Sequence, residues 1–316
     1  MDAAFYTVAD SKYFLGLTGL INSLRLTGHS QPIFVVDAGL TAAQRTALAG
    51  QCEFVPAPPV AVPRASLWKA AGPRARPAEV VLLIDSDIVV TGSLEPILEA
   101  ARNGQICAYP DPDGARWFAE WHTLYDLPPM RRQTYVNSGV VAVSTRAWPH
   151  FLDRWWELCQ RIRTHPTLYQ GGRNGVTSQP DQDAFNALMM SEFPAGALVP
   201  LAPQEGPISE DANRDQIDVL DERTFSCVHQ GVPVRLVHYA CQPKCWAPEA
   251  RARSQHHAYA RLLVRATTWP DAPVRLPKSE IPYWMRPDLV NRTRALVRRV
   301  AGRTFRLLQR RLTGGK

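Results

Sequence analysis

The sequence predicts an α/β protein with a mixed, mostly parallel sheet, and two observations carry this prediction. Short runs rich in β-branched and aromatic residues alternate with segments whose apolar residues recur at helical spacing, which is the pattern of βα units. The run Val80 to Ile84 is apolar at every position, as expected of a strand covered on both faces. The 316 residues allow a sizeable core, and we expect a single domain over 1–265 followed by a basic helical extension over 266–316.

The expected elements follow each other from the N-terminus. A strand at 5–8 precedes a helix from Phe14 to about Gly28, because apolar residues recur there every three or four positions. Thr41 suits the N-cap of a short helix that ends at 48, and Pro180 followed by acidic residues suits another helix start. The remaining strands are expected at 33–36, 80–84, 140–143 and 235–238, and the remaining helices from Ser93, over 148–162 and over 180–190.

The positive net charge belongs to the end of the chain. The sequence carries +7 overall, but the residues from Arg286 onward hold ten Lys or Arg and one Asp, so that this segment carries +9 and the rest −2. Apolar residues at helical spacing between these basic residues over 284–316 are typical of a helix on an anionic membrane surface. A nucleic-acid arm and an ordinary solvated end are the alternatives. We expect a membrane surface, and no nucleic acid, as the partner of this segment.

Neither a membrane span nor a secretory signal is expected. No stretch of about eighteen apolar residues occurs, and residues 1–4 lack the basic start and apolar stretch of a signal. We therefore expect a cytoplasmic protein that 284–316 can hold at the inner face of a membrane. In that compartment the six cysteines are expected to be thiols.

An acidic pair, Asp85-Ser86-Asp87, comes directly after the apolar run. Ligands of open α/β sheets bind at the carboxyl ends of the strands, and two alternate carboxylates can face one cation where a strand bends as it ends. Mg²⁺ and Mn²⁺ prefer such oxygen ligands and leave positions for substrate phosphates. The alternative is a loop in which one Asp caps a helix and the other is solvated. The preceding buried strand favours the cation site.

His238 ends the last expected strand, and Lys244 follows six positions later. A neutral imidazole can complete a metal site, and a Lys ammonium can hold a diphosphate as a point charge. The alternative for His238 is a structural histidine at a strand end. A rival zinc site is also conceivable on composition, since thiolates and imidazoles suit zinc, but the spacing is not a standard structural pattern and buried thiols are the more ordinary interpretation. That rival set consists of Cys227, His229, His238, Cys241 and Cys245.

Six segments in order over about 5–250 resemble the retaining glycosyltransferases of family 8, which have the GT-A fold. That family includes glycogenin-like enzymes and bacterial lipopolysaccharide galactosyl- and glucosyltransferases. The matching segments are Tyr6-Thr7-Val8-Ala9-Asp10 with Tyr13, Lys69, Asp85-Ser86-Asp87, Tyr135-Val136-Asn137-Ser138-Gly139-Val140, Pro180-Asp181-Gln182-Asp183, and His238 with Lys244 and Trp246.

The resemblance implies a role for each matching residue. The base and ribose of a nucleotide, most often uridine, would lie against Val8, Asp10 and Tyr13. A divalent cation, Mn²⁺ or Mg²⁺, would be bound by Asp85, Asp87 and His238, with Ser86 beside the donor. Lys69 and Lys244 would neutralise the diphosphate, and Asn137, Ser138, Asp181 and Gln182 would contact the donor sugar. Asp181 and Gln182 are the candidates to face the anomeric carbon, and neither is identified as a nucleophile.

The activity implied by the resemblance is retaining transfer of a hexose from a UDP-sugar to a saccharide or lipid-linked glycan. Cys241 and Cys245 stand where the family usually has Gly and Pro, and a Gly there would let the backbone approach a phosphate closely. The alternative is therefore a catalytically silent nucleotide- or glycan-binding protein of the same fold. A nucleotidyltransferase is disfavoured, because the loop at 9–12 is not rich in glycine and arginine.

Overall fold

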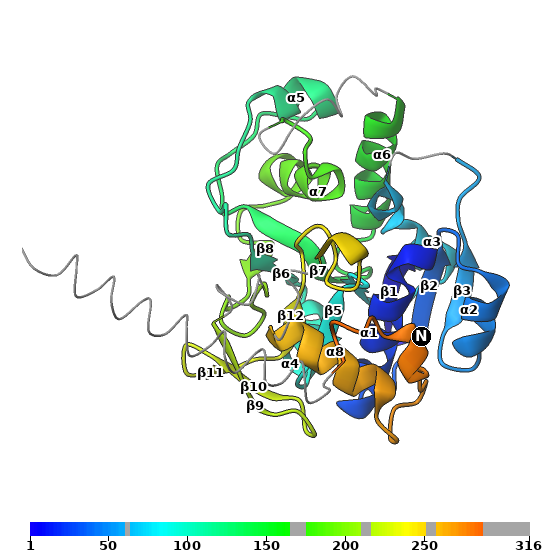
Figure 1. Cartoon of the computed structure of the whole chain (residues 1–316). Coiled ribbons are helices and arrows are strands. Elements are labelled where there is room, and N and C mark those ends of the chain that lie inside the picture. Colours follow the sequence, from blue (N-terminus) through cyan, green and yellow to red (C-terminus); the bar gives the residue numbers. More distant parts are fainter. Residues whose placement is uncertain (61–63, 165–174, 210–215, 251–256, 287–316) are drawn as a thin grey trace, which may run out of the picture.

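The structure is a computed structural model that describes residues 1–60, 64–164, 175–209, 216–250 and 257–286. Its centre is a seven-stranded sheet in the order β3-β2-β1-β4-β7-β6-β8 (Figure 1). Only β7 runs against its neighbours in this sheet. The expected mixed, mostly parallel sheet is therefore confirmed. The strands are β1 Ala3–Ala9, β2 Ile33–Asp37, β3 Glu53–Pro56, β4 Val80–Ile84, β6 Ile106–Pro110, β7 Val136–Ser144 and β8 Leu198–Pro200.

Helices cover both faces of this sheet, as the apolar run of β4 predicted. Val80, Leu82 and Ile84 of β4 belong to one buried cluster, which includes residues of α1, α4 and α8. Val81 and Leu83 belong to a second cluster with residues of α3, α5, α6 and α7. Alternate residues of a strand point to opposite faces, which explains the division. The helices are α1 Phe14–Leu26, α2 Ala42–Ala47, α3 Ala71–Ala75, α4 Glu95–Arg102, α5 Glu120–Tyr125, α6 Phe151–Thr164, α7 Pro180–Ser191 and α8 Ala258–Thr268.

Smaller elements complete the described chain. The 3₁₀ helices are η1 Ser11–Tyr13, η2 Ala65–Trp68, η4 Pro248–Ala250 and η5 Lys278–Glu280. β5 Ile88–Val90 pairs antiparallel with β12 Leu236–His238. β9 Ile217–Asp221, β10 Ser226–His229 and β11 Val232–Pro233 form a separate three-stranded sheet.

Most of the expected elements are present, with boundaries that differ by a few residues. Thr41 is the N-cap of α2 and forms a capping box with Gln44, which satisfies two backbone donors that a helix start leaves unpaired. The helix expected from Ser93 begins at Glu95, and the one expected from 148 begins at Phe151. The strands β3, β5, β6 and β8 to β11 and the helices α3, α5 and α8 were not expected.

The chain beyond residue 265 continues to pack with the core up to the last described residues. The expected boundary falls inside α8, and Asn22 of α1 binds the far side of that boundary through its amide. Its Nδ2 donates to the carbonyls of Ala266 and Val274, at 2.9 and 2.8 Å, and its Oδ1 accepts from Val274 N. Trp284 also belongs to the core cluster. The basic residues from 287 to 316 lie outside the described part of the chain.

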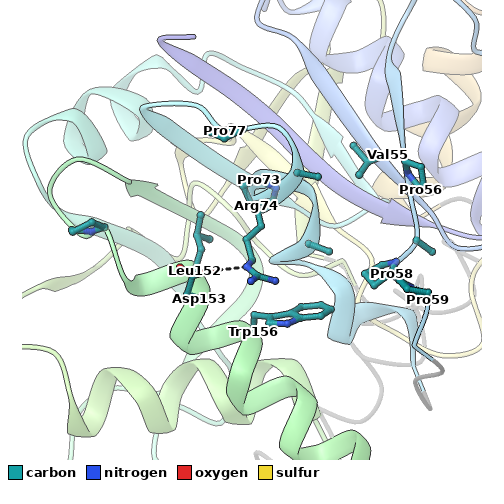
Figure 2. A pocket seen from close by; sticks show the side chains of 14 residues that line it. Val55, Pro56, Pro58, Pro59, Pro73, Arg74, Pro77, Leu152, Asp153 and Trp156 are labelled. Carbon is teal, nitrogen blue, oxygen red and sulfur yellow. Dashed lines mark hydrogen bonds and ion pairs between the residues drawn. The ribbon is translucent and has the colours of Figure 1, made fainter.

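The described helices are all too short or too polar to cross a membrane. A hollow of about 720 Å³ lies between α3, α6 and the end of β3 (Figure 2). None of its lining residues is a site residue expected from the sequence. The lining residues are Val55, Pro56, Ala57, Pro58, Pro59, Ala71, Pro73, Arg74, Ala75, Pro77, Pro149, Leu152, Asp153 and Trp156.

Candidate active site

The acidic pair forms the turn between β4 and β5, at the carboxyl end of a central strand. Asp85 N donates to Gly139 O of β7 at 2.8 Å, and Ile88 N donates to Asp85 O at 3.2 Å, which closes the turn. The β5–β12 ladder then places His238 opposite Ile88. The sheet edge and the ladder therefore bring the acidic pair and the histidine together, although they lie far apart in the sequence.

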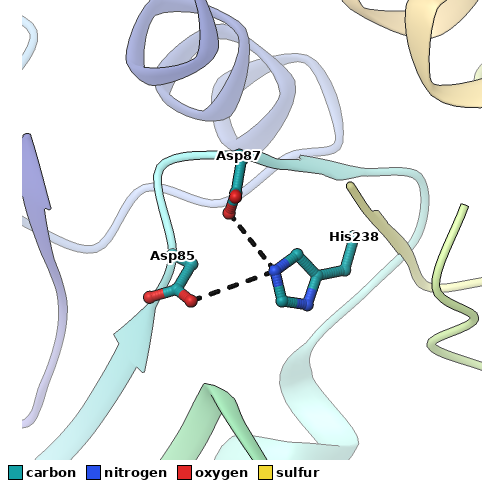
Figure 3. A group of neighbouring side chains, drawn as sticks. All are labelled: Asp85, Asp87 and His238. Carbon is teal, nitrogen blue, oxygen red and sulfur yellow. Dashed lines mark ion pairs between the residues drawn. The ribbon is translucent and has the colours of Figure 1, made fainter. Parts of the chain in front are cut away.

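Three side chains converge at this point (Figure 3). The Nε2 atom of His238 lies 3.3 Å from Asp87 Oδ1 and 3.9 Å from Asp85 Oδ2. All three ligand atoms lie within 4.8 Å of one another. Although His238 Nε2 lies nearby, no donor in the described part of the chain makes a hydrogen bond of acceptable geometry to the buried Asp87 Oδ1, and a buried unsatisfied oxygen normally carries a free-energy cost. Two carboxylates and an imidazole, with one buried oxygen unsatisfied, fit a divalent cation.

The rival zinc set is not assembled. In the described part of the chain, three His, Cys, Asp or Glu side chains gather at metal-binding distance only at Asp85, Asp87 and His238. Cys245 is fully buried, and burial raises the pKa of its thiol. All six cysteines are free thiols, as expected.

Lys69 links the acidic pair to helix α7. Its Nζ lies 2.8 Å from Asp85 Oδ1 and 2.8 Å from Asp181 Oδ2, and it donates to Ser138 O at 3.0 Å. Burial alone would lower the pKa of Lys69, but Asp181 and Asp85 raise it above its ordinary value. The buried ammonium is therefore charged and held by two carboxylates.

Lys244 occupies the other side of the acidic pair. It is buried, and its Nζ donates to Asp87 Oδ2 and, at 2.8 Å, to Tyr239 O. Burial would raise the pKa of Asp87, but Lys244 and His238 hold it well below the usual range. The ammonium also lies 5.7 Å from the ring centroid of Tyr13, so the residues after β1 and after β12 meet here.

The residues expected around the base are placed at the end of β1. Tyr13 OH accepts from Gln242 Nε2 at 3.0 Å, and its ring packs edge-on against Trp246. Asp10 Oδ1 accepts from the backbone N–H groups of Lys12 and Tyr13 and so caps η1. Val8 is half-buried and packs against the second core cluster. No hydrogen bond or ion pair between Val8 or Asp10 and the acidic pair occurs among the described residues.

The start of α7 carries three polar side chains, those of Asp181, Gln182 and Asp183. Asp181 accepts from Ser138 Oγ at 2.8 Å as well as from Lys69, and its pKa is lowered because these partners and Ser66 outweigh burial. Gln182 Oε1 accepts from Ser138 N at 3.0 Å. Ser138 therefore bonds to both expected residues of α7.

The third polar residue, Asp183, is bound within the core. Its carboxylate is fully buried and accepts from Arg116 Nε at 2.8 Å, from Arg116 Nη2 at 3.0 Å and from Tyr135 OH at 2.7 Å. Gln179 N donates to it at 2.9 Å. These bonds give Asp183 the contacts of a structural residue that anchors the start of α7.

Sequence reasoning missed four residues that the structure adds to this region, Ser66, Asp111, Arg116 and Gln179. Asp111 directly follows β6, so a prediction of that strand would have placed it at the sheet edge where ligands bind. The other three lie in segments without periodicity, and no signal in the sequence marks them.

The fold and the cluster define a class, an α/β protein with a candidate cation site at the strand ends. No protein-family model and no curated protein matches the sequence. The galactosyltransferase LgtC, solved in complex with donor and acceptor sugar analogs, aligns with a TM-score of 0.56 and 19% identity over 84% of this chain and 97% of that chain. The bifunctional glycosyltransferase WbbM, in its apo structure, aligns with a TM-score of 0.53 and 13% identity over 83% of this chain and 49% of that chain. The chain therefore has the expected GT-A fold.

Proposed function

We propose that the protein is a retaining glycosyltransferase that moves a hexose from a UDP-sugar to a saccharide or lipid-linked glycan. The observation that carries the proposal is the convergence of Asp85, Asp87 and His238 between two buried lysines at the strand ends. This arrangement joins a cation site to fixed positive charges, which is what a nucleoside diphosphate requires. The fold shared with LgtC supports the same assignment.

The cation would be Mn²⁺ or Mg²⁺, held by the three converging side chains. When bound, it would supply Lewis-acid stabilisation of the negative charge that develops on the departing diphosphate. The chain's own residues bind and orient the donor around it. Lys244, which binds Asp87 and lies 5.7 Å from the Tyr13 ring centroid, would contact a phosphate oxygen, and the base would lie against Val8, Asp10 and Tyr13.

The sugar would lie against the residues of β7 and α7. Lys69 contacts Ser138 and Asp181, and Ser138 binds Gln182 in turn. With Asn137, which precedes Ser138 on β7, these side chains would offer hydrogen-bonding groups to the sugar. Lys69 orients Asp181 and adds positive charge on this side of the donor, and Ser86 lies in the turn between the two acidic residues. We assign Asp181 and Gln182 to the side that faces the anomeric carbon.

The setting we propose is the inner face of a membrane, where residues 284–316 bring the enzyme to a lipid-linked acceptor. The ten basic residues from Arg286 onward and the apolar residues between them support this part of the proposal. Flotation of the full chain with anionic liposomes, compared with a chain that ends before Trp284, tests it. Equal flotation of both chains would contradict it.

UDP release from UDP-glucose, UDP-galactose and the two N-acetyl sugars, with and without Mn²⁺, tests the activity. We expect Mn²⁺-dependent release with one donor and its loss in Asp87→Ala. Asp153→Ala removes an exposed carboxylate on α6 and serves as the matched control. Metal-dependent UDP binding without release or transfer would instead favour a silent nucleotide-binding protein, for which Cys241 and Cys245 at the usual Gly and Pro positions are the argument. Unchanged release in Asp87→Ala would refute the metal assignment.

A further inference from the structure

We propose that Asp111 is a positioning residue that fixes the orientation of the Gln182 and Asn137 side-chain amides on the sugar side of the site. The inference rests on the proposed function, because it gives Asp111 a part in the same transfer.

Asp111 is itself held in place by the end of β6. It follows that strand directly, beside an irregularity in the β6–β7 register between Ala108 and Tyr109. Its backbone N–H donates to Tyr135 O at 3.1 Å, and its Oδ1 accepts from Asp113 N at 2.9 Å. The Oδ1 atom of Asp111 thus binds the backbone two residues further on, which leaves the Oδ2 atom for partners from other elements.

That second oxygen, Oδ2, binds both amides. It accepts from Gln182 Nε2 at 2.9 Å and from Asn137 Nδ2 at 3.3 Å. An ionised carboxylate only accepts hydrogen bonds, so each amide must turn its nitrogen toward Asp111. Bonds to a charged acceptor are also stronger than bonds between neutral groups.

The opposite end of each amide has a partner of the opposite kind. Gln182 Oε1 accepts from Ser138 N at 3.0 Å, and Asn137 Oδ1 accepts from Gly139 N at 2.8 Å. A backbone N–H only donates, so it requires the amide oxygen. If either amide were flipped, its NH₂ group would face a backbone N–H, so that two donors met. Its oxygen would face the carboxylate of Asp111, so that two acceptors met. A single orientation satisfies all of these bonds.

The network continues from Asp111 to the cation site. Ser138, which binds the oxygen of Gln182, donates its hydroxyl to Asp181, and Asp181 accepts from Lys69, which also binds Asp85. Asp111 is the far end of this chain of hydrogen bonds. Its removal takes the Asp111 acceptor from Asn137 Nδ2 and leaves Gln182 Nε2 with its bond to Gln179 Oε1 at 2.7 Å, while the contacts near the cation stay in place.

The kinetic test compares Asp111→Ala with Asp111→Asn in an enzyme whose transfer activity has been measured. Alanine removes the acceptor, and we expect kcat to fall about tenfold or more from the loss of a bond to a charged group. The KM for the donor should stay within about twofold, because Asp111 touches neither the cation ligands nor the lysines. Asparagine offers an amide oxygen to Gln182 and should restore most of kcat. A loss in Asp111→Asn as large as in Asp111→Ala would overturn the positioning role.

Two further comparisons keep the inference falsifiable. Asp113→Ala removes the neighbouring exposed carboxylate, and it should behave like wild type. Because Asp111 acts through Gln182 and Asn137, its removal from a variant that carries both Gln182→Ala and Asn137→Ala should cost much less than its removal from wild type. A full additional loss in that background would contradict the inference.

A readout independent of turnover separates this inference from the proposed function. The side-chain NH₂ signals of Gln182 and Asn137, assigned by their loss in Gln182→Ala and Asn137→Ala, should move and exchange faster with solvent in Asp111→Ala. Asp111→Asn should keep them close to wild type. Unchanged signals in Asp111→Ala would overturn the inference even in an active enzyme. The expected changes in a protein that releases no UDP would leave the positioning role standing and refute the activity.

Discussion

The Lys244 ammonium donates to the carboxylate of Asp87, one of the three side chains that converge as the candidate cation site. Lys69 does the same for Asp85 on the other side of the turn. The charges of both acidic residues are therefore offset before any cation or nucleotide is present. A cation that binds Asp87 must compete with the Lys244 ammonium for the carboxylate. When a diphosphate binds, Lys244 gains a second anion with which it can pair.

Replacing Lys244 by methionine is expected to increase the affinity of the nucleotide-free protein for Mn²⁺. Methionine keeps much of the side-chain volume but removes the competing charge, so the gain should be about tenfold, as for the loss of one modest charge interaction. The signal of free Mn²⁺ in electron paramagnetic resonance measures the affinity directly. Lys12→Met, which removes an exposed lysine, is the control. Equal or weaker binding by Lys244→Met would show that Lys244 does not compete with the cation.

Gly139→Ala is expected to weaken Mn²⁺ binding by displacing the histidine. A Cβ at this position would lie 2.5 Å from His238 Cε1 and 2.9 Å from His238 Nδ1, closer than such atoms approach. Displacement of a ligand by its surroundings typically costs about tenfold or more in metal affinity. At Gly92 the nearest atoms to an added Cβ are 3.5 Å away, so Gly92→Ala is the matched control. Isothermal titration with Mn²⁺ compares them, and equal affinities would contradict the predicted displacement.

Arg116→Met is expected to destabilise the protein strongly. The variant leaves the carboxylate of Asp183 fully buried without its cationic partner, and breaking a buried pair in this way costs about 3–5 kcal/mol. Arg74→Met breaks the exposed pair with Asp153 and should cost less than about 1 kcal/mol. Urea unfolding measures both free energies. Similar losses in the two variants would argue against a structural role for the Arg116–Asp183 pair.

His29 is expected to make the free energy of unfolding fall as the pH drops below neutrality. Its Nε2 accepts from Leu94 N at 3.0 Å, which requires an unprotonated nitrogen. Burial is the main cause that lowers the pKa of His29 below 6.5, with Glu95 raising it and Arg25 lowering it. The unfolded chain therefore binds more protons below this pH, and stability is lost as the pH falls from about 6.5 through the lower pKa of the folded state.

The comparison that isolates His29 is its replacement by glutamine, whose amide oxygen can accept the same bond without titrating. Between about pH 7 and pH 5, the free energy of unfolding should change less in His29→Gln than in wild type, since one linked proton is removed. Urea titrations at several pH values give both slopes. Identical slopes would exclude His29 as a linked group.

The parts of the fold that the sequence predicts are those with strong local patterns. β4 is a continuous apolar run and α1 repeats apolar residues at helical spacing, so both could be placed without knowing their neighbours. β6 contains Cys, Ala and Tyr between Ile and Pro, and β8 has three residues. Their pairing with β7 and with each other makes them strands, and that pairing is a tertiary contact.

The candidate site divides in the same way. Asp85 and Asp87 could be found because both stand at the end of one recognisable strand, and resemblance added His238, Lys69 and Lys244. The bond from Asp111 to Gln182 joins residues brought together only by the packing of α7 against the end of β6. The expected boundary at 265 falls inside α8. The sequence did not reveal this, because the contact that joins α8 to α1 through Asn22 is tertiary and leaves no pattern in the sequence of either helix.

The two-stranded ladder of β5 and β12 has a consequence for the biosynthesis of the protein. Two of the converging side chains lie in the first third of the chain, and the third follows in the last third. During translation the acidic pair is made long before its histidine, so the complete ligand set exists only after residue 238 has left the ribosome and β12 has docked. Binding of the cation by all three ligands is therefore possible only in a chain that has been synthesised beyond residue 238. A polypeptide that stops before β12 would lack the third ligand even if its central sheet had formed.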